Sequence, residues 1–101
     1  MKHDDILRLS LSTIGERGKD YGNHLSSFGR AATIAGTLLG RDVDPFEVGV
    51  IMMAVKMSRI SKTKKHKDSW VDLIAYTAFS AELVEEFFEE FPSPASHGAT
   101  E

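Results

Sequence analysis

The sequence predicts an all-α fold, a bundle of about four helices with a long C-terminal helix, and three observations support this. In four stretches, apolar residues recur at the three- and four-residue spacing of a helix face. No stretch alternates apolar and polar residues as a half-buried strand does. The chain has 101 residues, 42% of them hydrophobic and 27% charged, which suits one small core. We expect a single helical domain over residues 1–91 and a disordered tail over residues 92–101.

The first expected helix begins at a cap formed by Asp4 or Asp5 and runs to about Gly15. Its apolar stripe consists of Leu7, Leu11 and Ile14. Residues 16–23 then mix glycines, charges and one tyrosine, a composition typical of a loop. This segment is therefore expected to connect the first helix to the second.

The second and third helices have the clearest expected boundaries. The second covers residues 24–39, where small side chains predict close helix packing, and Gly40 supplies a stop. The third begins at a capping box in which Asp44 is the N-cap, Pro45 the first helical residue and Glu47 the third. Both boundaries follow from side-chain chemistry at the helix ends.

The third helix is apolar on two sides. One face carries Val48, Ile51 and Val55, and the other carries Val50, Met53, Met57 and Ile60. Such a helix is either central in its fold or part of an interface. A fourth helix, capped by Asp68 or Ser69 and ending before Pro92, completes the bundle. Because a core of this size gives marginal stability, we expect a homo-oligomer.

Composition and charge narrow the classes of function. The chain has no cysteine, no apolar signal-peptide run and no stretch long enough to span a membrane, so we expect a cytoplasmic protein without membrane contact. Its formal net charge of −3 argues against general nucleic-acid binding.

A charged cluster is expected between the third and fourth helices. Lys56 and Arg59 share one polar stripe, while Asp72 lies within an apolar run, with Tyr76 one turn later. A buried carboxylate in such a setting needs a partner. One interpretation is a structural ion pair of Asp72 with Arg59 or Lys56.

The other interpretation is a site for a nucleotide or a related phosphate ligand. Cationic side chains that converge with loop amides suit a phosphate, and Tyr21, Trp70 or Tyr76 can stack on a base. The expected ligand-binding residues are Arg17, Lys19, Tyr21, Gly22, Lys56, Arg59, Asp72 and Tyr76. The sequence supports no catalytic residue, and the cofactor stays open, with Mg²⁺ required only for an enzyme. Asp68 and Asp72, spaced i, i+4, are the residues that would then bind the metal.

Several motifs together resemble a known family. They are Tyr21-Gly22, Phe28, Lys56-x-x-Arg59, and the run from Asp68 to Tyr76 that contains Asp72. Over residues 16–83 the chain resembles short phage-encoded helical proteins of unassigned function. More distantly it is similar to MazG-like and dimeric dUTPase-like nucleotide pyrophosphohydrolases.

The resemblance implies a phage-type protein, located in the host cytoplasm, that binds a nucleotide with weak or no pyrophosphohydrolase activity. The alternative is a non-enzymatic oligomeric protein that binds or inhibits a host factor. It would use its apolar third helix and the aromatic end of the fourth, which carries Phe87, Phe88 and Phe91. The two hypotheses differ in whether Arg59 and its neighbours bind a ligand.

Overall fold

Within the residues that the structure describes, the fold consists of four α-helices. The computed structural model describes the backbone of residues 1–21 and 23–87 and the side chains of residues 1–17 and 23–86. The helices are α1 (His3–Tyr21), α2 (His24–Leu39), α3 (Pro45–Lys62) and α4 (Lys67–Phe87). No strand occurs within these described residues, which confirms the all-α class predicted from the sequence.

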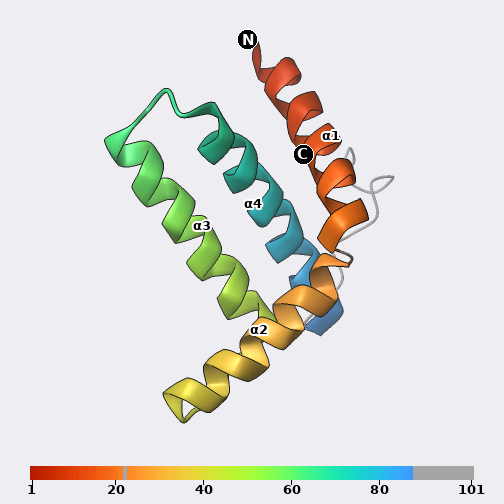
Figure 1. The fold of residues 1–101 in the computed structure, drawn as a ribbon, viewed down its shortest axis with the longest axis vertical. Coiled ribbons are helices and arrows are strands. Elements are labelled where there is room, and N and C mark those ends of the chain that lie inside the picture. Colours follow the sequence, from red (N-terminus) through yellow and green to blue (C-terminus); the bar gives the residue numbers. More distant parts are fainter. Residues whose placement is uncertain (22, 88–101) are drawn as a thin grey trace, which may run out of the picture.

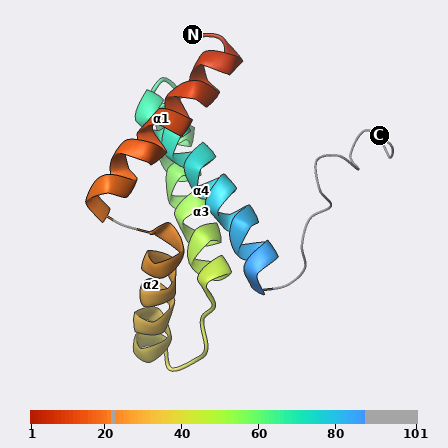
Figure 2. The same ribbon diagram turned by 90° about the vertical axis from the view of Figure 1, so that its right-hand side faces the viewer.

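The helices α3 and α4 form an antiparallel hairpin, which is the most extensive helix pair of the molecule (Figure 1). Helix α1 packs along α4, and α2 crosses the foot of the hairpin and contacts α3 (Figures 1 and 2). As a result α4 is central, whereas α3 forms one edge of the molecule (Figure 1).

The predicted ends of α2 and α3 are confirmed. Gly40 has φ 72°, the left-handed conformation that glycine adopts without steric cost, and its N–H donates to the Gly36 carbonyl. At the start of α3, the Asp44 side chain accepts a hydrogen bond from the Glu47 N–H at 2.8 Å. The Glu47 side chain pairs with Arg41 at 3.0 Å.

The expected loop over residues 16–23 was wrong for most of its length, because α1 continues to Tyr21. Isolated glycines cost a helix interior only about 1 kcal/mol each, which tertiary packing can offset. Here Gly15 lies in open space and the next turn supplies Arg17, which forms an ion pair with α4. Packing of α1 on α4 therefore outweighs the local composition.

The expected caps of α1 and α4 were also placed too late. Helix α1 begins at His3, so Asp4 and Asp5 lie in its first turn, and the Asp5 side chain accepts from the Lys2 N–H. Helix α4 begins at Lys67, which places Asp68 and Ser69 inside its first turn. Acidic side chains in a first turn are favourable to the helix dipole without acting as caps. The end of α4 before Pro92 and the tail lie outside the described residues.

The hydrophobic core is small and lies between α4 and the other helices. Helices α3 and α4 approach closely where the backbone of Gly49 lies against Ser80. Beside this contact, Phe28 of α2 packs against Tyr76 and Phe79 of α4, with ring centroids 6.0 and 6.1 Å away. Among the described side chains, the buried hydrophobic residues are Phe28, Ala32, Ile60, Val71, Ala75 and Leu83.

No helix in the described part of the chain is long and apolar enough to cross a membrane.

Candidate functional site

Asp72 joins three helices through two cations. It lies on α4 and is buried, with 7% of its surface exposed. Lys56 of α3 places Nζ 3.0 Å from Asp72 Oδ2, and Arg17 of α1 places Nη1 2.5 Å from Asp72 Oδ1. The three residues are hereafter called the Asp72 cluster. It brings together one predicted cation of the third helix, Lys56, and one of the segment after Gly15, Arg17.

The electrostatics of the Asp72 cluster keep its carboxylate ionised. Burial by itself would raise the pKa of Asp72, but hydrogen bonds from Lys56 and Arg17, together with their positive charges, lower it below its ordinary value. The Lys56 side chain is only 12% exposed, whereas that of Arg17 is 49% exposed. Lys56 and Asp72 are therefore a buried pair, and Arg17 closes the cluster from the solvent side.

Arg59 does not belong to the Asp72 cluster, although it follows Lys56 by one turn of α3. Its side chain is exposed, and no described residue forms an ion pair with it. It lines a pocket of about 330 Å³ at the C-terminal end of α3, together with Lys62, Thr63 and His66. These four residues are hereafter called the basic pocket. Their side chains provide hydrogen-bond donors, and none of them is a carboxylate.

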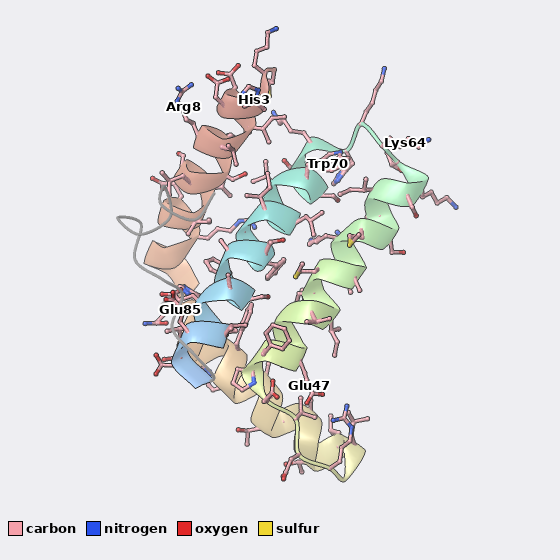
Figure 3. All side chains as sticks on the ribbon, turned by 180° about the vertical axis from the view of Figure 1, so that it is seen from behind. His3, Arg8, Glu47, Lys64, Trp70 and Glu85 are labelled. Carbon is pink, nitrogen blue, oxygen red and sulfur yellow. The ribbon has the colours of Figure 1, made fainter. Side chains whose placement is uncertain are left out.

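The turn between α3 and α4 holds the basic pocket in shape. His66 Nδ1 lies 2.7 Å from Ser69 Oγ, and Ser69 is buried. The Trp70 indole N–H donates to the Lys64 carbonyl at 2.8 Å, which fixes the ring against the same turn (Figure 3). Trp70 is 42% exposed, so one large aromatic surface near the pocket remains open to solvent.

Tyr76, the other aromatic residue predicted at the site, lies elsewhere. It packs in the cluster with Phe28 and Phe79, on the side of α4 that faces α2. Beside this cluster, the ring of His24 stacks on Phe79 with centroids 4.0 Å apart and contacts the Glu82 carboxylate. These contacts give Tyr76 a packing role in the core.

The remaining predicted residues are placed only in part. Gly22 and the side chains of Lys19 and Tyr21 lie outside the described residues, so their contribution stays a prediction. Asp68 is exposed, and both carboxylate oxygens of Asp72 already contact cations. A metal ion shared by these two aspartates would have to displace Lys56 or Arg17, which this geometry does not favour. In the described part of the chain, no group of three or more His, Cys, Asp or Glu side chains has a metal-binding arrangement.

Sequence reasoning did not assign three residues of the basic pocket to a site, namely Lys62, Thr63 and His66. The lysine-rich run after α3 is also typical of a solvated loop, so its composition alone does not indicate a site. The turn bonds of His66 and Trp70, which draw this run against α4, depend on side chains whose pairing is not evident from spacing.

Comparisons with known proteins identify the family. Residues 5–84 match the family described as "Domain of unknown function (DUF6378)". The chain is also 32% identical over 76 residues to the "Gene 55 protein" of Mycobacterium phage D29, an alignment that covers 75% of the chain and 48% of that protein. The chain thus spans about half the length of this relative. No solved structure matches the present chain. These matches support the predicted resemblance to phage proteins and do not extend to MazG-like or dUTPase-like enzymes. The chain belongs to the DUF6378 family.

Proposed function

We propose that this protein binds a nucleotide or a related phosphate-bearing molecule in the basic pocket. The observation that carries the proposal is the convergence of Arg59, Lys62, Thr63 and His66 around one pocket of about 330 Å³. That volume lies in the range of small-molecule sites, roughly 300–1,000 Å³. No carboxylate of the same chain is among the described residues that line this pocket, which favours an anion, and the planar guanidinium of Arg59 suits the paired oxygens of a phosphate.

The Asp72 cluster favours this location over the space between α3 and α4. Lys56 and Arg17 already neutralise Asp72, so a phosphate that bound them would have to compete with a carboxylate at 2.5 and 3.0 Å. Arg59 has no such competitor among the described residues. We therefore assign the Asp72 cluster to helix packing and the basic pocket to ligand binding.

Trp70 supplies the argument for a nucleotide over a simpler phosphate. Its indole ring is held against the α3–α4 turn by the bond to the Lys64 carbonyl and stays 42% exposed. Stacking of a base on an aromatic ring contributes about 1–3 kcal/mol to nucleic-acid binding, and a nucleotide base offers the same surface. A phosphate in the basic pocket and a base on Trp70 would use both features.

The proposal concerns binding and includes no hydrolytic step. A magnesium-assisted reaction needs carboxylates that are able to coordinate the ion, and the oxygens of Asp72 are held by Lys56 and Arg17. Hydrolysis by a MazG-like mechanism stays a separate hypothesis from the resemblance. It would show as release of pyrophosphate that requires Mg²⁺ and Asp72.

A fluorescence titration tests the proposal directly, because Trp70 is the single tryptophan of the chain. Nucleoside mono-, di- and triphosphates are added with and without Mg²⁺, and inorganic phosphate serves as a ligand without a base. We expect nucleotides to change Trp70 emission in a saturable way and inorganic phosphate to bind more weakly. If no nucleotide changes the emission or the melting temperature of the protein at millimolar concentration, the proposal is wrong.

A further inference from the structure

Helix α3 exposes an apolar face that the rest of the described chain does not cover. Because a helix turns about 100° per residue, Val50, Ala54 and Met57 line one strip of α3 and Ile51 and Val55 line the next. The four large side chains are between 39% and 57% exposed, and Ala54 is exposed as well. These five residues are hereafter called the outer face of α3. Helix α3 itself lies along one edge of the molecule in Figure 1.

The opposite face of α3, in contrast to the outer face, is covered by other helices. Gly49 and Ile60 are buried against α4 and its neighbours, and Lys56 is nearly so. The two apolar faces predicted from the sequence do not coincide with these surfaces, because Ile60 is buried whereas Val50 and Met57, predicted on its face, are exposed. The outer face brings four large exposed apolar side chains together on one helix, and the largest apolar patch of a typical monomer is often functional.

We propose that the outer face of α3 pairs with the same face of a second copy, with the two α3 helices antiparallel. A standard interface buries about 800 Å² per partner, of which roughly 60%, or about 500 Å², is apolar. The outer face would form the apolar centre of such an interface. The small core, in which two of the six buried hydrophobic residues are alanines, gives a reason for the chain to gain stability by association.

The charges at the two ends of α3 favour a second copy of this chain as the partner and favour an antiparallel orientation of the two helices. Glu47 lies at the N-terminal end of α3, where it also pairs with Arg41 at 3.0 Å, and Lys62 lies at the C-terminal end. The geometry of a helix places both residues on the side that carries the outer face. In Figure 3, Glu47 and Lys64 mark these opposite ends. Two antiparallel helices would place each Glu47 opposite Lys62 of the other copy, and their helix dipoles would also oppose. Parallel helices would instead place like charges together.

The middle of the outer face permits a close crossing. Ala54 lies about halfway between Glu47 and Lys62, so a two-fold axis through the paired helices would pass near it. A small side chain at the crossing lets two helices approach to the usual 8–10 Å between axes. Val50, Ile51, Val55 and Met57 would then pack on both sides of the crossing.

Sedimentation equilibrium of the full chain tests the pairing without any ligand. We expect the wild-type mass to be about twice the 11.2 kDa of one chain at tens of micromolar. Ile51→Glu should give a single-chain mass, because it would bury two carboxylates in the interface. The matched control Leu7→Glu changes a similarly exposed residue on α1 and should leave the mass doubled. A wild-type monomer, or dissociation by Leu7→Glu and not by Ile51→Glu, would overturn the proposal.

A charge-exchange experiment covers the case in which Ile51→Glu fails to fold. Glu47→Lys and Lys62→Glu should each weaken self-association, because each puts like charges together twice. Mixing the two variants should restore a dimer with one chain of each kind, since both contacts then join opposite charges. If the mixture associates no better than either variant alone, the antiparallel arrangement is wrong. This readout is mass alone, so failure of nucleotide binding would not affect it.

Discussion

Two cations three residues apart on α3 have different surroundings. Lys56 is nearly buried and bonded to Asp72, whereas Arg59 is exposed at the rim of the basic pocket with no ion-pair partner among the described residues. The Asp72 cluster joins α1, α3 and α4, while the basic pocket is built from the end of α3 and the turn that follows. The comparison teaches that a cation with a buried partner serves the fold, and a nearby cation without one is available to a ligand.

The largest expected effect comes from removing the carboxylate of the Asp72 cluster. Asp72→Asn leaves Lys56 nearly buried without a counter-charge, so we expect the free energy of unfolding to fall by about 3–5 kcal/mol. Urea denaturation followed by circular dichroism measures this loss. The matched control is Asp68→Asn, one turn earlier on α4 and exposed, which should cost less than about 1 kcal/mol. Equal losses in the two variants would contradict a structural role for the cluster.

The α3–α4 contact that aligns Lys56 with Asp72 is open to a test without any change of charge. A Cβ at Gly49 would clash with Ser80 Oγ and lie 3.2 Å from Ser80 Cβ, so Gly49→Ala should destabilise the fold by about 1–3 kcal/mol. Gly29→Ala on α2, where a Cβ meets nothing within 4 Å, should instead stabilise by about 0.5–1 kcal/mol. A stabilising Gly49→Ala would mean that the two helices are further apart than described.

Acid should weaken the Asp72 cluster selectively. The pKa of Asp72 is lowered in the folded protein, so its contribution to stability is present above the unfolded value of about 3.9 and is lost as pH falls below it. Unfolding free energies measured between about pH 6 and pH 2 should therefore fall more steeply for the wild type than for Asp72→Asn. Parallel curves for the two proteins would show that Asp72 makes no pH-dependent contribution.

How far the sequence predicts this molecule depends on the kind of interaction. The ends of α2 and α3 were predicted because Gly40 and Asp44 act on the adjacent backbone, and that chemistry is local. The continuation of α1 to Tyr21 was not predicted. It depends on packing against α4 and on the pairing of Arg17 with Asp72, which is far away in the sequence. From the sequence, we predicted that Asp72 pairs with either Lys56 or Arg59 of the third helix. The rotation of α3 about its axis places Lys56 against Asp72, and this rotation cannot be derived from spacing alone.

The basic pocket shows the same limit for function. The spacing of Lys56 and Arg59 predicted a charged stripe on the third helix. Which of the two pairs with Asp72 depends on burial, because Lys56 is nearly buried whereas Arg59, on the neighbouring flank of the helix, is exposed. Lys62, Thr63 and His66 lie in a segment whose composition is typical of a solvated loop. Their convergence with Arg59 follows from the turn that begins α4 and is visible only in three dimensions.

The most direct test is the rise in Tm that a saturating nucleotide produces in Arg59→Ala compared with the wild type. A ligand that binds only the folded state raises Tm, and loss of one charge-assisted phosphate contact costs about 1.5–3 kcal/mol, or roughly tenfold to a hundredfold in Kd. We predict that Arg59→Ala keeps the Tm of the unliganded protein within about two degrees and loses most of the nucleotide-dependent rise. A full rise in Arg59→Ala, or a large fall in its unliganded Tm, would contradict the assignment of this arginine to ligand binding.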